Sequence, residues 1–257
     1  MIKIVFFDID GTLLPFHSNV VPESTKNAIR QLHKKEIRTV IATGRYMDEI
    51  VTLTIMELDF DAFLTLNGQL ILNRDQKRLF STVITSQEIE FMTSYLQKKG
   101  VAFSLIGEKQ RYIGNYDKYP AEIQKFIPKD FSGIDERYDE EIYQCTAMIN
   151  SEMKAYLQET LKECKVVSWN ESGVDVIPKS GGKAAGMKKL MTYLGIKPQE
   201  SMAFGDADND RDMLSYAAIG VAIGNADECV KEAADYVTTP ASEDGIANAL
   251  RHFGLIE

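Results

Sequence analysis

The sequence has few cysteines, no long apolar run and no excess of basic charge. Its three cysteines, Cys145, Cys164 and Cys229, are odd in number and widely spaced, which argues against a disulfide framework and a zinc site. No apolar run approaches the roughly 18 residues of a membrane span, and the first residues lack a signal-peptide pattern. The net charge of -9 excludes a global basic surface for nucleic acid. We therefore expect a cytosolic protein that binds neither nucleic acid nor a membrane.

Several short apolar runs end abruptly at small or polar residues. Such runs, bounded by turn-forming residues, are typical of strands buried on both faces. They cover residues 2–7, 38–42, 61–66 and 201–204. Helical patterns lie between them, in a segment that opens at Pro22, over 46–56 and over 183–194. Strands that alternate with helices predict an α/β fold with a doubly wound, parallel, Rossmann-like sheet.

The segment 82–182 has a different pattern. Helical stretches alternate there with runs of strand-forming residues, and 112–138 holds many aromatics and prolines, as loops and short elements do. The stretches and runs cover 87–98, 152–163, 101–106 and 146–150. We interpret this segment as an inserted α+β domain. The parallel-sheet domain would then consist of residues 1–81 and 183–257.

Four predicted strands end at residues that can carry chemistry. These residues are Asp8, Thr43, Asn67 and Asp206, and they span some 200 positions of the chain. An open parallel sheet places ligands beyond the carboxyl ends of its strands. We therefore expect the four side chains to meet at one edge of the sheet.

The first motif is Asp8-Ile9-Asp10-Gly11-Thr12. Two carboxylates two residues apart repel each other unless a cation or a proton lies between them. Mg²⁺ prefers oxygen ligands and keeps waters, so it suits such a group, and Gly11 allows a sharp turn. A capped turn accounts for the Asp pair alone equally well. The position directly after a strand favours the metal site.

The second motif is Gly205-Asp206-Ala207-Asp208-Asn209-Asp210. It does not fit the twelve-residue calcium loop of an EF-hand. A solvated helix N-terminus is the alternative, since the helix dipole favours acids there. Because Asp206 follows a predicted buried strand, we favour a metal ligand on the same edge as Asp8, with Asp208 and Asp212 mostly solvated.

A third group is Thr43-Gly44-Arg45 together with Lys183. A hydroxyl, exposed amides and a cation are the groups that a phosphoryl group needs. The stretch around Lys183 is not a P-loop, because Ile177 stands at a required Gly and Ala184 replaces Ser or Thr. The sequence therefore favours phosphoryl binding without an ATP-type loop.

Together the motifs resemble the haloacid dehalogenase-like (HAD) phosphohydrolase superfamily, and its Cof-type (subfamily IIB) branch in particular. Asp8 to Thr12 resembles its first motif, Ala42 to Arg45 its second, Gly182-Lys183 its third and Gly205 to Asp210 its fourth. Asn67-Gly68 stands where this branch has a further Asn-Gly pair near the phosphate. The segment 82–182 resembles its cap domain.

The resemblance implies roles for individual residues. Asp8 would attack phosphorus to form an aspartyl-phosphate, and Asp10 would protonate the leaving alcohol and then activate water. Mg²⁺ would bind the Asp8 and Asp206 carboxylates and the Asp10 backbone carbonyl, and Asp210 would act on the same metal, through water or by orienting its ligands.

The remaining candidates bind substrate. The resemblance implies that the phosphoryl group is bound by Thr43, Gly44, Asn67, Lys183 and Asn209, the last of which also orients the metal ligands. Arg45 and Asp175 are candidate substrate-binding residues, Asp175 near the end of the inserted segment.

We thus predict a Mg²⁺-dependent phosphatase for a small phosphorylated metabolite, such as a sugar phosphate or pyridoxal phosphate, acting as a monomer or homodimer. One alternative is a phosphomutase or phosphotransferase, because an aspartyl-phosphate can pass its group to an alcohol. Another is a phosphorelay receiver, which also combines strand-end acids, a Thr and a Lys. Receivers are about half this length and need no large insertion, which disfavours that alternative.

Overall fold

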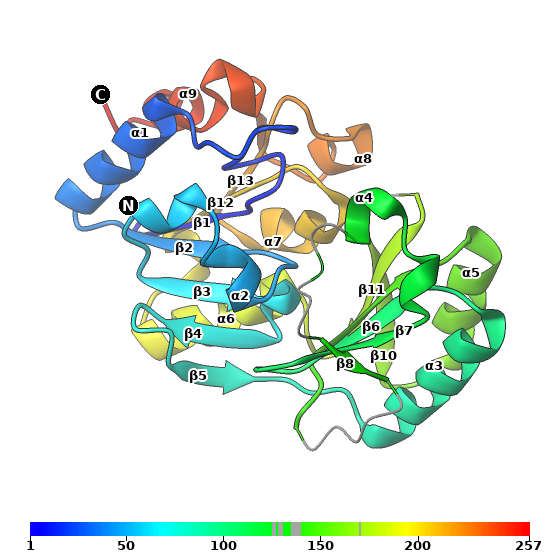
Figure 1. The fold of residues 1–257 in the computed structure, drawn as a ribbon. Helices are drawn as coiled ribbons and strands as arrows, with labels where there is room; N and C mark the ends of the chain where they lie inside the picture. The colour runs from blue at the N-terminus through cyan, green and yellow to red at the C-terminus, as the bar shows by residue number, and fades with distance from the viewer. Residues whose placement is uncertain (125–126, 128–130, 135–139, 170) are drawn as a thin grey trace. The chain divides into compact units, whose positions relative to one another are not determined.

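The computed structural model describes residues 1–124, 127, 131–134, 140–169 and 171–257. The chain divides into two compact units (Figure 1). Unit 1 consists of Met1–Phe80 and Gly182–Glu257, and unit 2 of Ser81–Gly181. No helix within the described ranges is long and apolar enough to cross a membrane.

Unit 1 is built on one sheet with the strand order β14-β13-β12-β1-β2-β3-β4-β5. The strands are β1 Ile4–Phe7, β2 Arg38–Ala42, β3 Ala62–Thr65, β4 Leu70–Asn73, β5 Arg78–Ser81, β12 Ser201–Gly205, β13 Ile219–Ala222 and β14 Tyr236–Val237. From β14 to β3 all pairs are parallel, whereas β4 pairs with β3 antiparallel. All four residues of β1 are buried, as expected of a parallel strand covered on both faces.

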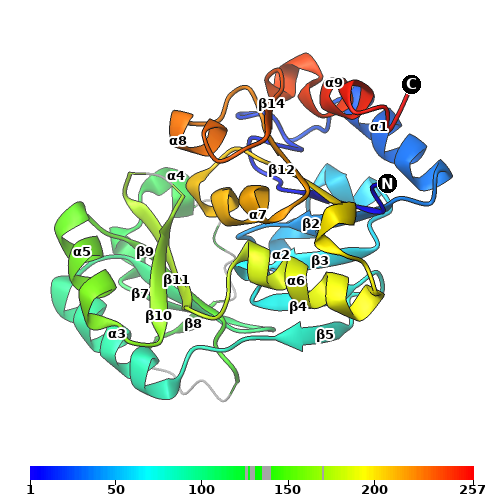
Figure 2. The same cartoon turned by 180° about the vertical axis from the view of Figure 1, so that it is seen from behind.

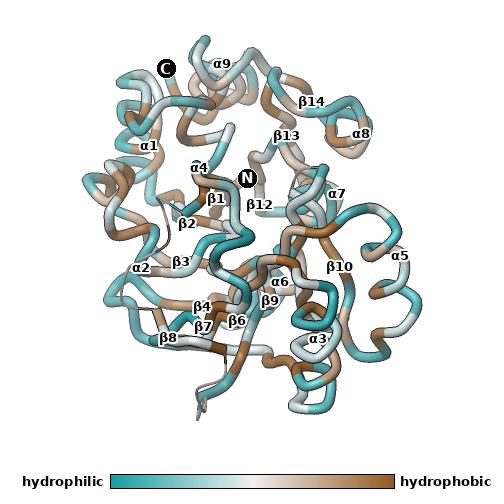
Figure 3. Tube along the Cα trace, turned by 45° about the vertical axis from the view of Figure 1, so that its right-hand side comes forward, coloured by the Kyte–Doolittle hydropathy of each residue, from teal (hydrophilic) through white to brown (hydrophobic). Residues whose placement is uncertain are grey.

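Helices cover both faces of this sheet. They are α1 Glu23–Lys34, α2 Met47–Ile50, α6 Lys183–Leu194, α7 Arg211–Tyr216, α8 Glu228–Lys231 and α9 Gly245–His252. The helices α6 and α7 lie over one face, and α1 and α9 lie together over the other (Figure 2). Met187 and Leu190 of α6 pack with Met213 of α7 against the strands. Figure 3 shows apolar and polar residues alternating along α1, whose apolar face includes Ile29 and Leu32.

Unit 2 has its own sheet, with the order β10-β11-β9-β6-β7-β8. Its elements are α3 Ser86–Lys99, β6 Phe103–Ile106, β7 Arg111–Gly114, α4 Ala121–Gln124, β8 Ser132–Gly133, β9 Gln144–Met148, α5 Ser151–Thr160, β10 Cys164–Ser168 and β11 Gly173–Pro178. Its pairs are antiparallel except β7 with β8. The helices α3 and α5 contribute Met92, Leu96 and Leu157 to an apolar core with the buried side chains of β6, β9 and β11.

The predicted α/β fold with a parallel sheet is confirmed, and α6 has the bounds expected from the sequence. The hairpin of β4 and β5 was not predicted, and it adds antiparallel strands at one end of the sheet. The prediction of a single helix over 46–56 is wrong, because α2 ends at Ile50 and a 3₁₀-helix, η1 Thr54–Glu57, follows. The β-branched residues Ile50 to Thr52 lose side-chain freedom in a helix, which favours that break.

In unit 2 the predicted helix 152–163 also ends early. The helix α5 stops at Thr160, and Leu161 adopts an extended conformation that buries its side chain in the core. The chain then enters β10 at Cys164. Burial of Leu161 thus overrides the helical pattern of the sequence. Of the segment 112–138, residues 125–126, 128–130 and 135–138 lie outside the described residues.

Candidate active site

The carboxyl ends of four neighbouring strands carry the polar residues that the sequence singles out. Asp8 follows β1, Thr43 follows β2 and Asp206 follows β12, and β1 pairs in parallel with both of its neighbours. Asn67 lies in the 3₁₀-helix η2, Leu66–Gly68, directly after β3. Sheet pairing thus brings distant parts of the chain to one edge of unit 1.

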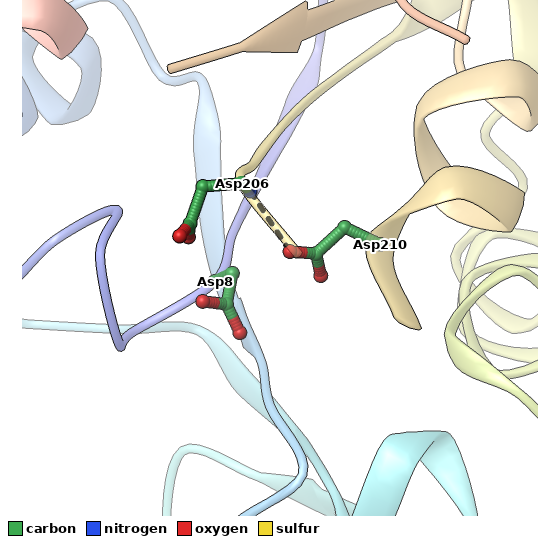
Figure 4. Close-up of side chains that lie close together, drawn as sticks. All are labelled: Asp8, Asp206 and Asp210. Carbon is green, nitrogen blue, oxygen red and sulfur yellow. Dashed lines mark hydrogen bonds between the residues drawn. The ribbon is translucent and has the colours of Figure 1, made fainter. Parts of the chain in front are cut away.

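Three carboxylates come together at this edge. Asp8, Asp206 and Asp210 each offer one oxygen within 4.8 Å of the others, and all three residues are buried. Figure 4 shows them approaching one another from the end of β1 and from the segment after β12. Asp210 lies in the 3₁₀-helix η5, Asp208–Asp210.

Lys183 supplies a buried positive charge. It is the first residue of α6 and is 1% exposed, and its Nζ donates to Asp8 Oδ1 at 2.6 Å and to Asp210 Oδ1 at 2.5 Å. Burial lowers the pKa of Lys183, but the nearby Asp210 and Asp8 carboxylates outweigh burial and raise the pKa above its ordinary value. Lys183 therefore stays charged.

Asp210 is fully engaged by hydrogen bonds. Its Oδ1 accepts from Lys183, and its Oδ2 accepts from the backbone amides of Asp206 at 2.9 Å and Ala207 at 3.1 Å. The first of these amide bonds is drawn in Figure 4. Asp210 is 0% exposed. Asp210 is therefore suited to orienting Lys183 and the Asp206 loop. It is less suited to binding a metal directly, because both of its oxygens already accept hydrogen bonds.

The other two carboxylates carry raised pKa values. Burial, and then repulsion by Asp210, raise the pKa of Asp8 well above its ordinary value, against the lowering effect of Lys183. The same two causes raise the pKa of Asp206 to about 7, although the Thr12 hydroxyl donates to its Oδ1 at 2.7 Å. Three buried carboxylates thus face one buried ammonium group. Ionising all of them requires further positive charge.

The Asp10–Gly11 peptide lies in a turn beside these carboxylates. The Thr12 amide donates to the Ile9 carbonyl at 3.3 Å, and Gly11 has a φ of 81°, as a type II turn requires at its third residue. A Cβ at Gly11 would lie 2.1 Å from Asp206 Oδ2. Only glycine therefore fits at this position.

The turn leaves one carbonyl without a donor. The carbonyls of Asp8, Ile9 and Gly11 accept hydrogen bonds, whereas no donor among the described residues reaches the carbonyl of Asp10. Within the same ranges, Asp8 Oδ2 and Asp206 Oδ2 also accept none. Two carboxylate oxygens of buried residues and one carbonyl oxygen are a suitable donor set for a hard divalent cation, which completes its coordination with water. The residues therefore fit a metal of this class.

Asp10 itself pairs with Arg45. The Arg45 guanidinium donates from Nε to Asp10 Oδ2 at 2.8 Å and from Nη2 to Asp10 Oδ1 at 2.7 Å. Hydrogen bonding to Asp10 is the largest cause of a raised Arg45 pKa. The Asp10 side chain is 52% exposed, so this pair is solvated, unlike the Lys183 pairs. The sequence singled out both residues but did not predict their pairing.

The candidate phosphate-binding residues are linked to one another. The Asn67 backbone amide donates to the Thr43 carbonyl at 2.8 Å, and Asn209 Nδ2 donates to Asn67 Oδ1 at 3.0 Å. Gly44 lies between Thr43 and Arg45, whose amide donates to the Thr43 hydroxyl. Leu66 and Asn67 have φ values of 53° and 55°, a left-handed conformation that is costly for leucine. These bonds hold that conformation and fix the Asn67 loop to the Thr43 loop.

Three further residues that the sequence analysis weighed are Asp208, Asp212 and Asp175. Asp208 and Asp212 are exposed, as expected, and Asp208 pairs with Arg211. Asp175 belongs to β11 of unit 2, where it is buried and accepts from the Thr146 hydroxyl at 2.7 Å. Asp175 thus contributes to a polar network within unit 2.

Sequence reasoning assigned no role to Thr12 or Asn225. Thr12 orients Asp206, and Asn225 Nδ2 donates to the Gly11 carbonyl at 3.0 Å. Thr12 lies inside the first motif, so its position was a usable signal. Asn225 lies 214 positions from Gly11, and the sequence has no signal that links the two.

Comparisons with known proteins show which family the chain resembles. Residues 5–250 match the family described as haloacid dehalogenase-like hydrolases. YkrA of Bacillus subtilis strain 168, whose assignment as a phosphatase is itself provisional, is 32% identical over 99% of both chains. YcsE of the same organism, a 5-amino-6-(5-phospho-D-ribitylamino)uracil phosphatase, is 30% identical over 99% of this chain and 96% of its own. The structure of the HAD subclass IIB sugar phosphatase BT4131 superposes with a TM-score of 0.88 at 35% identity, over 99% of this chain and 100% of the other.

Proposed function

The chain belongs to the haloacid dehalogenase-like hydrolases and is a phosphatase, and we propose that it hydrolyses a small phosphorylated metabolite, such as a sugar phosphate, with Mg²⁺ and an aspartyl-phosphate intermediate. One observation carries the proposal. Asp8, Asp206 and the Asp10 carbonyl keep oxygens that accept no hydrogen bond from the described residues, beside a Lys183 that is buried and charged.

Asp8 is the proposed nucleophile. One carboxylate oxygen forms a bond to phosphorus as the bond from phosphorus to the leaving oxygen breaks, and Asp10 gives that oxygen a proton. Water then attacks the aspartyl-phosphate, Asp10 takes a proton from the water, and phosphate and Asp8 are released. Two like charges at 4 Å repel by about 4 kcal/mol at an effective dielectric of 20. Lys183, which contacts Asp8 at 2.6 Å, offsets part of that repulsion.

The remaining repulsion calls for a cation. Mg²⁺, when bound, would supply positive charge to the Asp8 carboxylate and to the transferring oxygens. The residues that would hold it are Asp8, Asp206 and, through its carbonyl, Asp10. Asp210 would keep Lys183 and the Asp206 loop in place by the hydrogen bonds described above.

The Asp10–Arg45 pair bears on the proton transfer. A carboxylate whose two oxygens both accept from a guanidinium cannot donate a proton while so paired, so we propose that substrate binding separates the pair. The cost is small because the pair is exposed. Arg45 then becomes available to the substrate, while Thr43, Gly44, Asn67, Lys183 and Asn209 bind the phosphoryl oxygens.

We propose that residues 82–182 form a cap domain that recognises the leaving group, with 1–81 and 183–257 as the catalytic core. Support comes from BT4131, a sugar phosphatase that matches this chain over its whole length. Asp175, with its partner Thr146, is the proposed recognition group for substrate hydroxyls. The cytosolic address and the monomeric or dimeric state stay predictions.

The test is phosphate release by the purified protein from p-nitrophenyl phosphate and a panel of sugar phosphates. We expect activity with Mg²⁺ and its loss with EDTA. Asp8→Asn should lower kcat/KM by at least about 10³-fold. Asp208→Asn is the matched control, because Asp208 is an exposed acid near the same edge, and we expect it to stay within about threefold of the unsubstituted enzyme. Undiminished activity of Asp8→Asn would reject the covalent mechanism.

A further inference from the structure

The orientation of one peptide group decides whether the Asp10 carbonyl can reach a cation. In a turn over Ile9–Thr12, types I and II differ mainly by a flip of the central peptide, here Asp10–Gly11. The Gly11 amide donates to the Leu14 carbonyl at 2.8 Å. Because the amide and carbonyl of one trans peptide point in opposite directions, this bond turns the Asp10 carbonyl away from Leu14.

The next peptide, Gly11–Thr12, is held at both ends. The Thr12 amide donates to the Ile9 carbonyl, and the Gly11 carbonyl accepts from Asn225 Nδ2 at 3.0 Å. Asn225 lies in the loop between β13 and α8 and is half-buried, and its Oδ1 accepts from the Ala241 amide at 3.0 Å. The Ala241 bond fixes the Asn225 carboxamide, so its donor points at the turn. A glycine turn without that clamp has more conformations open to it.

We propose that Asn225 is a positioning residue for the cation site. Its side chain holds the Asp10–Gly11 turn in the type II form and so keeps the Asp10 carbonyl available to Mg²⁺. The inference rests on the proposed function, because it assumes that this carbonyl binds the metal. Asn225 acts through the backbone of Gly11, while Thr12 orients the Asp206 carboxylate. Together they position two of the three proposed metal-binding groups.

Two variants separate the clamp from general stability. Asn225→Ala removes both hydrogen bonds. Asn225→Asp keeps the acceptor for the Ala241 amide, but it replaces the donor to Gly11 with a carboxylate oxygen, which repels the Gly11 carbonyl and adds a negative charge. Asn248→Ala is the matched control: Asn248 Nδ2 donates to Thr239 Oγ1 at 2.9 Å and to the Glu243 carbonyl at 3.1 Å, near Ala241, and no bond of its side chain involves Gly11. Asp206→Asn serves as the reference for loss of the metal site.

The measurement is Mg²⁺ binding without substrate, by isothermal titration calorimetry, followed by kcat at saturating Mg²⁺. We expect both Asn225 variants to raise the Mg²⁺ dissociation constant about tenfold, with kcat largely restored by high Mg²⁺. Asn248→Ala should bind Mg²⁺ normally, even if it unfolds at a lower temperature.

Two results would overturn the inference. Normal Mg²⁺ binding by Asn225→Ala and Asn225→Asp, with binding lost in Asp206→Asn, would make Asn225 a structural residue only and leave the proposed function intact. Absence of Mg²⁺ binding by the unsubstituted protein would remove the proposed metal-dependent function together with the role of Asn225.

Discussion

At the amino ends of β2 and β3, Arg38 pairs with Asp61 and Arg74 pairs with Asp59 around a polar pocket that His33 also lines. At the carboxyl ends of the same strands and their neighbours, Asp8 and Asp210 pair with Lys183, and the Asp206 carboxylate lies beside these two acids. Both edges of the sheet thus combine acids and bases, but in opposite environments. The Arg74 and Asp59 side chains are 57% and 69% exposed, whereas those of Lys183 and Asp210 are 0% exposed.

The two environments shift the pKa of an aspartate in opposite directions. At the amino edge, the hydrogen bond from Arg74 lowers the pKa of Asp59. At the carboxyl edge, burial raises the pKa of Asp8 despite its contact with Lys183. Exposed pairs are balanced and screened by water, whereas the buried group holds more acids than bases. Burial with unequal charge, rather than charge alone, makes the carboxyl edge suited to binding a cation.

The largest contrast should come from removing one base at each edge. Lys183→Met leaves buried acids without their partner, and we expect it to lower the free energy of unfolding at pH 8 by about 3–5 kcal/mol. Arg74→Met, the control at the amino edge, should cause no measurable change, because its pair is solvated. Urea denaturation of both variants checks this. Equal losses of stability would show that burial does not distinguish the two edges.

The next effect concerns the turn at Gly11. Gly11→Ala meets Asp206 Oδ2 and also requires a φ of 81°, whereas Gly254→Ala, at a φ of 67°, meets no atom within 4 Å. We expect Gly254→Ala to cost about 1–2 kcal/mol of stability with normal Mg²⁺ binding. Gly11→Ala should cost more and should also weaken Mg²⁺ binding, measured by calorimetry. Intact Mg²⁺ binding by Gly11→Ala would count against a cation at this turn.

A further effect is expected from pH. The Asp206 pKa is about 7 in the folded protein and about 3.9 in an unfolded chain. Between these values the folded state binds more protons, so the stability of the metal-free protein falls as pH rises from about 4 to about 7. Asp8 contributes with the same sign. Since Mg²⁺ competes with these protons, the rise in Tm that it causes should grow over the same range.

Thermal unfolding in EDTA and in Mg²⁺, from pH 5 to 8, measures both trends. Asp206→Asn should flatten the pH dependence in EDTA, because it removes one of the titrating groups. An unchanged slope in that variant would show that Asp206 is not protonated in the metal-free protein.

The smallest effect should come from Asp61→Ala at the amino edge. Asp61 Oδ2 accepts from the Thr39 amide at 2.9 Å, and its loss should cost about 1 kcal/mol of stability. We expect kcat/KM and the Mg²⁺ dissociation constant to stay unchanged. A changed Mg²⁺ affinity would mean that the two edges are coupled through the sheet.

The sequence was sufficient to predict that these polar residues meet at one edge of the sheet. Asp8, Thr43 and Asp206 end apolar runs, and the rule that parallel strands place ligands at their carboxyl ends brought them together. The same patterns predicted α6 and the parallel strands β1, β2, β3 and β12, but not β13 and β14. These features depend on local periodicity, which a single sequence shows, and on a rule of topology that applies to parallel sheets in general.

Other features depend on contacts that no local pattern encodes. The left-handed conformation of Leu66 is set by bonds to the Thr43–Arg45 loop, and leucine gives no signal for it. The pairing of Arg45 with Asp10 depends on side-chain directions at two strand ends. Asn225 reaches Gly11 only because β13 lies two strands from β1. In each case tertiary structure decides the contact.

The most direct test of the account is to trap the phosphoryl group. Asp10→Asn with Mg²⁺ and p-nitrophenyl phosphate, whose leaving group needs no proton, should accumulate phosphoenzyme, because water is no longer activated. Acid quenching and peptide mass spectrometry should find the phosphoryl group on Asp8, and EDTA should prevent its appearance. A phosphoryl group on another residue, or on Asp8 in the presence of EDTA, would contradict a cation-dependent attack by Asp8.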